Sequence, residues 1–373
     1  MPDAWWEQVG PRRFCTEVLR CLQTKSVAVC FPQFSVEDLL DGIDSGLPRL
    51  CYYWDAEEKP DAYEAAKAEM GDGLDDPIEF FLNKTGVVVV KNIRRGAWAS
   101  WQRFVEAYLR KVNSISRRTG GDSPRFLLLT RGVTEEALRP VGVDLKILLY
   151  KSRVSCVDVE QYCRGAMESR VTSPVERQVK AAIIAQLALW DKGLADWLCF
   201  KDLSELVSPA GLLQRYAEQR RISAQSEGSW HNGTKDWIDG QCRESSLLLA
   251  AKNDDRIFNR VWRGQLKVLM PFIEERRCDF VDFVREHLPS VPQEANIEEF
   301  EFCKLGWLIS NHLKCEQQAA GQVYHDIAEA FGLVRNELAH RKPASAFLLD
   351  RMFTASERLD TLLQNGPLAT AGR

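Results

Sequence analysis

The chain has 373 residues, is 45% hydrophobic and 27% charged, and has the composition of a folded globular protein. Its formal net charge of −4 argues against a surface coated with positive charge for non-specific binding of nucleic acid. The first residues lack the basic and apolar segments of a secretory signal, and no apolar run is long enough to span a bilayer, so we expect a cytoplasmic protein with no membrane partner.

Five short apolar runs in the first 150 residues have the length and composition of buried strands. They are Val27–Phe31, Leu50–Trp54, Gly86–Lys91, Arg125–Thr130 and Lys146–Tyr150. Helical patterns separate them, and the first of these begins at Ser35 in a capping-box pattern and continues to Ile43. Apolar strands that alternate with helices indicate an α/β domain, in which a five-stranded, mainly parallel sheet has helices on both faces.

The order of these strands and helices resembles the core of a P-loop ATPase of the AAA or STAND kind, over roughly residues 1–220. The phosphate-binding loop of such enzymes needs glycines that let the backbone approach phosphates, together with a lysine and a hydroxyl. The first strand is instead followed by Pro32-Gln33-Phe34-Ser35, and the third by Lys91-Asn92, where the resemblance implies acidic residues. We therefore predict a degenerate P-loop domain that lacks Walker motifs, does not hydrolyse ATP, and senses a trigger or binds a partner. Whether it still binds a nucleotide stays open.

Helical patterns dominate after residue 153. Those over 157–167, 174–190 and 209–220 predict a helical annex or lid. The stretch Ser223–Gly240 is rich in Gly, Ser, Asn and Asp and is predicted to be a linker. The predicted domains are 1–152 for the α/β domain, 153–222 for the annex, 223–244 for the linker and 245–373 for a helical bundle.

The C-terminal third is predicted to be all helix, over 254–287, 298–313, 317–340 and 344–363. Pro271 lies inside the first of these helices and is expected to kink or split it. Pro289 and Pro292 are expected to end it. Four helices joined by short connections that carry prolines indicate an antiparallel four-helix bundle.

The eleven cysteines are scattered and form no CxxC pair. Cys30 and Cys303 lie in apolar runs, where a reduced thiol packs as a small hydrophobic side chain. Cys303, His312 and Cys315 could be drawn together as a metal site, but a fourth ligand at zinc-like spacing is missing. We therefore predict buried, reduced cysteines, no metal and no cofactor.

The third predicted helix of the bundle ends in Arg335–His340 (Arg-Asn-Glu-Leu-Ala-His), and Pro343 follows it. Pro343 cannot continue a helix and disfavours helical backbone at Lys342, so the helix should end near His340. Arg335 and His340 are five residues apart, which is roughly 140° around an ideal helix. One helix therefore does not direct both side chains to the same point. A frayed last turn, or a second copy of the chain, would be needed to bring such groups together.

A four-helix bundle whose third helix ends in Arg-Asn-x-x-x-His resembles the HEPN superfamily, over roughly residues 245–373. The resemblance implies a metal-independent endoribonuclease that acts as a toxin or in antiphage defence. It also implies that Arg335, Asn336 and His340 are catalytic. His340 would move protons at the ribose 2′-hydroxyl or the leaving oxygen, Arg335 would hold the scissile phosphate, and Asn336 would orient His340 or the substrate. Arg341 and Lys342 are candidate contacts to the RNA backbone.

HEPN enzymes generally build their active cleft between two copies, so the resemblance also implies a homodimer through the C-terminal bundle. RNA is the expected substrate, and an antitoxin or another defence-system protein is the expected partner. The alternative is a HEPN-like domain that keeps the motif but only binds or dimerises, as a non-catalytic scaffold in a larger defence complex. In that case Arg335 would simply pair with Glu337 or with a neighbouring helix.

Overall fold

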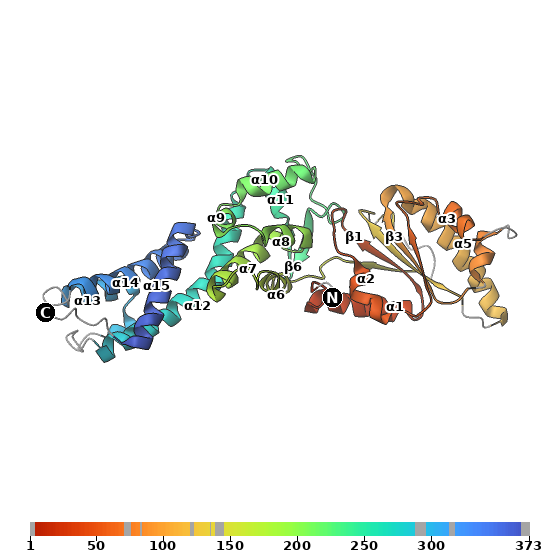
Figure 1. The fold of residues 1–373 in the computed structure, drawn as a ribbon. Helices are drawn as coiled ribbons and strands as arrows, with labels where there is room; N and C mark the ends of the chain where they lie inside the picture. The colour runs from red at the N-terminus through yellow and green to blue at the C-terminus, as the bar shows by residue number, and fades with distance from the viewer. Residues whose placement is uncertain are drawn as a thin grey trace. The chain divides into compact units, whose positions relative to one another are not determined.

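The computed structural model describes residues 4–70, 76–82, 84–119, 123–134, 136–138, 145–287, 296–312 and 318–366. The chain, whose course is shown in Figure 1, divides into two compact units. Unit 1 comprises Met1–Tyr162, Ala188–Leu194 and Ala217–Leu248, and unit 2 comprises Cys163–Leu187, Ala195–Tyr216 and Leu249–Arg373. The predicted domain boundaries, which treat each domain as one continuous stretch, stay a prediction.

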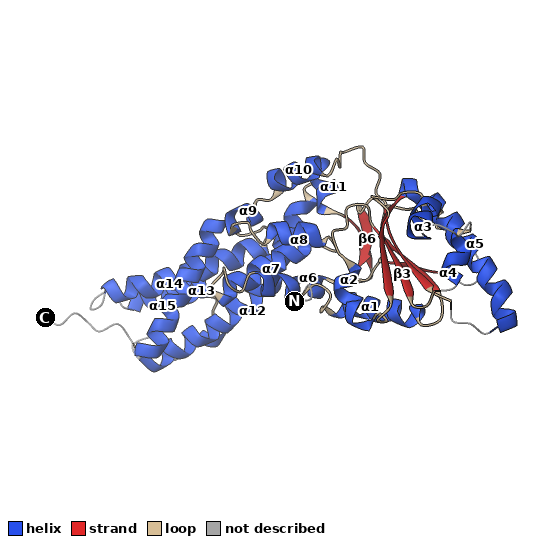
Figure 2. Cartoon of the chain, turned by 45° about the vertical axis from the view of Figure 1, so that its right-hand side comes forward, coloured by secondary structure: helices blue, strands red, loops and turns tan. Residues whose placement is uncertain are grey.

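Unit 1 contains a five-stranded parallel sheet, drawn in red in Figure 2. Its strands are β1 (Ser26–Phe31), β2 (Cys51–Asp55), β3 (Val87–Arg94), β4 (Arg125–Arg131) and β5 (Leu145–Leu149), in the order β2-β3-β4-β1-β5. Every neighbouring pair is parallel, and each strand overlaps one of the five predicted from the sequence. The prediction of an α/β domain built on a parallel sheet is therefore confirmed.

Helices cover both faces of this sheet (Figures 1 and 2). They are α1 (Val9–Leu22) and α2 (Leu39–Ile43) on one face, and α3 (Ala62–Met70), α4 (Pro77–Leu82) and α5 (Arg95–Thr119) on the other. On the first face, Phe14 of α1 packs against Tyr150, with ring centroids 5.0 Å apart. On the second face, Phe81 of α4 packs edge-on against Phe126 of β4 at 5.9 Å. All of β1 is buried as a result, which explains its uninterrupted apolar sequence.

The loop after β1 differs from the prediction. α2 begins at Leu39, and its N-cap is Asp38, whose carboxylate accepts a hydrogen bond from the Leu40 N–H at 3.0 Å. Ser35 does not cap the helix; its hydroxyl donates to the carboxylate of Glu37. The expected helix start at Ser35 was wrong because Asp38 supplies an equally good cap later in the chain. Residues 32–38 therefore form a loop at the carboxyl end of β1, and the short turn η1 (Asp44–Gly46) follows α2.

The stretch predicted as a linker contains a two-stranded antiparallel sheet of β6 (Lys235–Ile238) and β7 (Gln241–Glu244). Asp236 of β6 is 3% exposed and accepts a hydrogen bond from the Ser152 N–H at 3.2 Å. Trp230, which precedes this hairpin, is buried in the core of unit 1. The segment is thus packed against the rest of its unit.

Helices dominate the chain after the parallel sheet, as predicted. They are α6 (Cys156–Ala166), α7 (Pro174–Ala188), α8 (Lys192–Leu198), α9 (Leu203–Val207), α10 (Ala210–Gln219), α11 (Ser246–Ala251), α12 (Arg256–His287), α13 (Phe302–His312), α14 (Gln318–Ala339) and α15 (Ala346–Asn365), with the short turn η2 (Ile297–Glu299) before α13. In unit 2, α14 packs against α12, α13 and α15. The ring of Phe302 on α13 stacks on Phe331 of α14 at 4.7 Å, and Phe283 of α12 packs on Tyr324 of α14 at 5.7 Å. The predicted helical C-terminal region is confirmed.

Two expectations for unit 2 were wrong, one of them in part. α12 is one helix through Pro271, so it is not split there, whereas the expected kink stays a prediction. Pro271 lies on the exposed side of the helix, where a carbonyl that loses its helical partner can bond to water. Cys303, which was expected to be buried, is exposed, although its sulfur lies beside Gly332 of α14. Pro289, Pro292 and Cys315 lie outside the described residues.

None of the helices that the structure describes has both the length and the apolar content needed to cross a bilayer.

Candidate functional site

α14 ends in a tightly hydrogen-bonded turn. The helix ends at Ala339, and Arg341 follows with a φ of 59°, the left-handed backbone that is common just after a helix end. The Arg341 N–H donates to the Leu338 carbonyl at 3.1 Å, and the Lys342 N–H donates to the Glu337 carbonyl at 2.9 Å. These bonds satisfy carbonyls that the end of a helix leaves without partners. The helix therefore ends where the proline that follows it predicts.

α12 holds both sides of this turn. Trp262 Nε1 donates to the Leu338 carbonyl at 2.8 Å. Gln265 is fully buried; its Nε2 donates to the Ala344 carbonyl at 2.9 Å, and its Oε1 accepts from the Ala344 N–H at 2.7 Å. An amide side chain that pairs with both backbone groups of one residue fixes the position of that residue. The backbone around His340 is thus anchored on either side.

Asn336 and His340 lie next to each other at this end of α14. They are four residues apart, which places them on one face of the helix, and both are exposed. Within the described part of the chain, neither side chain has a hydrogen-bond or ion-pair partner. Arg341 and Lys342, which follow directly, are exposed as well. One helix end thus presents an amide, an imidazole and two cations to solvent.

Arg335 has a different environment. Its Nη2 lies 2.8 Å from Oε1 of Glu301, which directly precedes α13, and the two side chains are 30% and 56% exposed. The pKa of Glu274 on α12 is lowered, mainly by a hydrogen bond from Arg277 and also by the charge of Arg335. Arg335 therefore faces α12 and the start of α13, and no contact among the described residues joins it to His340.

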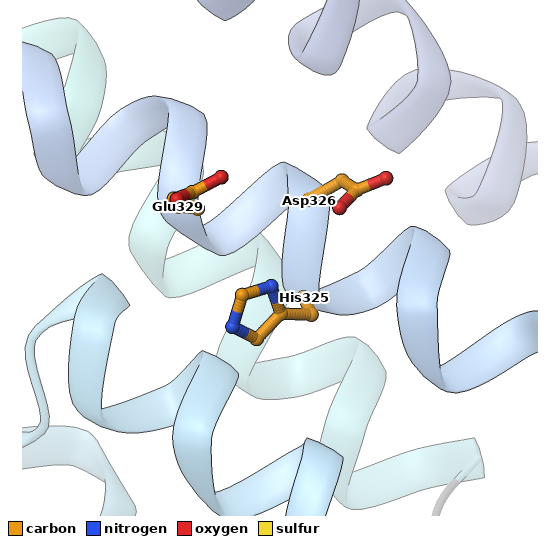
Figure 3. A group of neighbouring side chains, drawn as sticks. All are labelled: His325, Asp326 and Glu329. Atoms are coloured by element: carbon orange, nitrogen blue, oxygen red, sulfur yellow. The ribbon is translucent and has the colours of Figure 1, made fainter. Parts of the chain in front are cut away.

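One group of described side chains could hold a metal ion: His325, Asp326 and Glu329, all on α14 (Figure 3). Their ligand atoms lie within 4.8 Å of one another. Both carboxylates already have protein partners, because Gln322 Nε2 donates to Asp326 at 2.7 Å and Arg351 Nη2 lies 2.9 Å from Glu329. These contacts favour a structural role for the whole group.

A second polar site, which the sequence analysis missed, lies in unit 1 at the carboxyl end of the sheet. From β1 the chain runs towards β2 at one edge of the sheet, and from β4 it runs towards β5 at the other edge. The carboxyl ends of the neighbouring strands β1 and β4 therefore form a topological switch point, where open α/β sheets commonly bind ligands. Arg131, at the end of β4, donates from Nη2 to the Glu37 carbonyl at 2.8 Å. Glu37 is 3% exposed, and burial raises the pKa of its carboxyl.

A cavity of about 20 Å³ lies beside Glu37, and Phe34, Tyr150, Asp191 and Arg220 are among its lining residues. Its volume suits one water molecule. Asp191 and Arg220 form an ion pair whose side chains are 13% and 12% exposed. These two residues lie 29 positions apart in segments that carry no motif, so only the place of Glu37 after β1 could have indicated this site.

Comparisons with known proteins place the chain in no family. No protein-family model matches it, and no curated protein matches it. Among solved structures, it is similar to the RuvB Holliday junction branch migration motor of Thermotoga maritima, with 12% identity, 56% of this chain and 74% of that chain covered, and a TM-score of 0.36. A point mutant of RuvB from the same organism gives 13% identity, coverage of 56% and 63%, and a TM-score of 0.32. Likenesses at this level do not establish a shared fold or function.

Proposed function

We propose that the chain is a metal-independent endoribonuclease of the HEPN type, which acts as a toxin or an antiphage-defence effector. The observation that carries this proposal is that Asn336 and His340 lie side by side at a helix end that α12 holds in place. Both side chains are exposed, and neither has a partner among the described residues. An exposed histidine on a fixed backbone can reach a large substrate and can donate or accept a proton.

The proposed reaction is attack by a ribose 2′-hydroxyl on the adjacent phosphate, which forms a cyclic phosphate and releases the 5′-oxygen of the next nucleotide. His340 takes the hydroxyl proton or protonates the leaving oxygen. Arg335 binds the phosphate oxygens through two parallel hydrogen bonds and stabilises the charge that develops on them. Asn336 orients the imidazole or the substrate, and Arg341 and Lys342 bind the RNA backbone.

The proposed site is completed by a second copy of the chain. Arg335 is turned towards Glu301, away from His340, so one chain does not present both groups to one phosphate. A homodimer through the bundle would pair the arginine of one copy with the histidine of the other. We further propose that unit 1 carries a degenerate P-loop-like domain that senses a trigger or binds an antitoxin or another defence protein, because the loop after β1 lacks the glycines and the lysine of a phosphate-binding loop.

Cleavage of single-stranded RNA by the purified full-length chain, in the presence of a chelator, tests this proposal. His340→Ala is expected to lower the cleavage rate by about a hundredfold or more, the usual effect of removing a general acid or base. Arg358→Ala, which changes an exposed residue elsewhere in the bundle, is expected to leave the rate unchanged. Equal cleavage by wild type and His340→Ala would reject the assigned site.

A non-catalytic scaffold is the second candidate function. Large aromatic side chains in unit 2 are exposed, among them Phe200 at 67%, Trp307 at 65% and Phe347 at 69%. Such side chains are common at protein interfaces, and the ion pair of Arg335 within its own chain fits a domain that no longer binds RNA. A scaffold would leave RNA intact and would co-purify with a partner protein equally well as wild type or as His340→Ala.

A further inference from the structure

Glu301 is bonded to the motif residue that is best suited to bind phosphate. Its carboxylate lies 2.8 Å from the Arg335 guanidinium, at the surface of the bundle. We propose that Glu301 competes with the substrate phosphate for Arg335, and so lowers the affinity of the site for RNA until a phosphate displaces it. This inference rests on the proposed ribonuclease function and adds to it a regulatory contact within the same chain.

The backbone of Glu301 cannot move away from Arg335 easily. The next residue, Phe302, is fully buried and stacks on Phe331, with ring planes only 11° apart. Arg335 lies one helical turn after Phe331, so the ion pair is the next contact along the same interface. A Cβ at Gly332 would lie 2.4 Å from the sulfur of Cys303 on α13, so α13 and α14 approach each other closely at this point. The side chain of Glu301 can therefore change rotamer while its backbone stays in place.

The other acidic group near Arg335 already has a cation. Glu274 accepts a hydrogen bond from Arg277 Nε at 2.9 Å, and Arg277 Nη1 donates to the Phe300 carbonyl at 3.4 Å. Arg277 thus neutralises Glu274 and contacts the segment that carries Glu301. Within the described residues, Glu301 is the carboxylate that bonds Arg335 directly. Removal of this one carboxylate would therefore make the guanidinium available.

The contact is weak enough to be displaced. An ion pair with both side chains partly exposed gains little, because water and salt screen it. A phosphate can instead form two parallel hydrogen bonds with the same guanidinium. Competition of this strength would change the affinity for RNA by about two- to fivefold.

The test measures binding of a fluorescent, mixed-sequence single-stranded RNA to full-length chains that carry His340→Ala, so that the RNA stays intact. Adding Glu301→Gln is expected to tighten binding by about two- to fivefold. The matched control is Asp360→Asn, which removes a carboxylate of similar exposure, 50% against 56% for Glu301, from Arg276 on the same bundle. This control has the same change in net charge and is expected to leave the affinity nearly unchanged. In chains that also carry Arg335→Ala, the gain from Glu301→Gln is expected to disappear.

Three results would overturn the inference. The first is an effect of Glu301→Gln on RNA affinity that is no larger than that of Asp360→Asn. The second is a gain in affinity that persists in chains with Arg335→Ala. The third is weaker RNA binding by Glu301→Gln, which would make Glu301 a residue that positions the arginine. Cleavage by the chain with native His340 separates this inference from the proposed function. His340-dependent cleavage without a gain from Glu301→Gln rejects the inference alone, whereas RNA that is neither bound nor cut rejects both.

Discussion

At the scale of single residues, buried polar side chains fix backbone segments that carry no regular structure. Gln265 pairs with both backbone groups of Ala344 and so holds the turn after α14, beside the exposed Asn336 and His340. In unit 1, the buried carboxylate of Asp236 instead joins two segments, because it accepts hydrogen bonds from the Ser152 N–H at 3.2 Å and from the Trp237 N–H in its own strand at 2.7 Å. Each of these hydrogen bonds replaces a hydrogen bond to water, so the burial of the side chain stabilises the fold only if the side chain is held in place.

Asp236 should make the stability of unit 1 depend on pH. Burial raises the pKa of its carboxyl to about 6, above the value of about 3.9 in an unfolded chain. The folded state therefore binds this proton more tightly, so the contribution is complete below about pH 4 and is lost as the pH rises through about 6. Asp236→Asn removes the titration, and the stability of wild type relative to the variant should fall by at most about 3 kcal/mol between about pH 4 and pH 7.

Urea unfolding followed by tryptophan fluorescence measures this difference at each pH. Asp239→Asn is the matched control, since it changes an exposed carboxyl of the same hairpin in the same way. A difference between wild type and Asp236→Asn that is the same at both pH values would contradict the burial of a titrating carboxyl.

At the scale of elements, local sequence patterns predicted the strands and helix ends that depend on residues close together in the chain. The five strands follow from uninterrupted apolar runs, and the end of α14 follows from Pro343. Where two local signals competed, as Ser35 and Asp38 did for the start of α2, the pattern could not rank them. The pairing of Arg335 with Glu301, and of Arg220 with Asp191, joins residues about thirty positions apart and depends on how helices pack. No spacing rule reaches that far, which is why the surroundings of the candidate site could not be predicted.

Helix packing in unit 2 depends on a close approach of α12 to α7. A Cβ at Gly264 of α12 would lie 2.7 Å from the Cα of Ile183 and 2.8 Å from its nitrogen, both backbone atoms that cannot rotate away. Gly264→Ala should therefore lower the free energy of unfolding by about 1–3 kcal/mol, in spite of the better helix propensity of alanine. Gly211→Ala in α10, where a Cβ meets nothing within 4 Å, should be neutral or stabilising by up to about 1 kcal/mol. Chemical denaturation of both variants tests this packing, and equal effects would contradict it.

At the scale of the whole molecule, the candidate site is incomplete within one chain. Arg335 contacts Glu301, while Asn336 and His340 face solvent at the end of α14. The two sets of groups are on different sides of one helix, and a fixed helix end prevents them from turning towards each other. If this chain cuts RNA as proposed, a second copy must supply the missing group, and the interface is self-complementary in a two-fold dimer.

A mixture of two inactive variants tests this arrangement. Arg335→Ala and His340→Ala should each lack cleavage alone. When the two are co-expressed, half of the randomly formed dimers combine one intact arginine with one intact histidine across the interface, and each has one of its two sites restored. Activity should therefore recover to about a quarter of the wild-type level, and light scattering should show the mass of a dimer. A mixture that stays inactive while the dimer forms would mean that each chain uses its own Arg335 and His340. That result would require the end of α14 to unwind, against the anchoring that Trp262 and Gln265 provide.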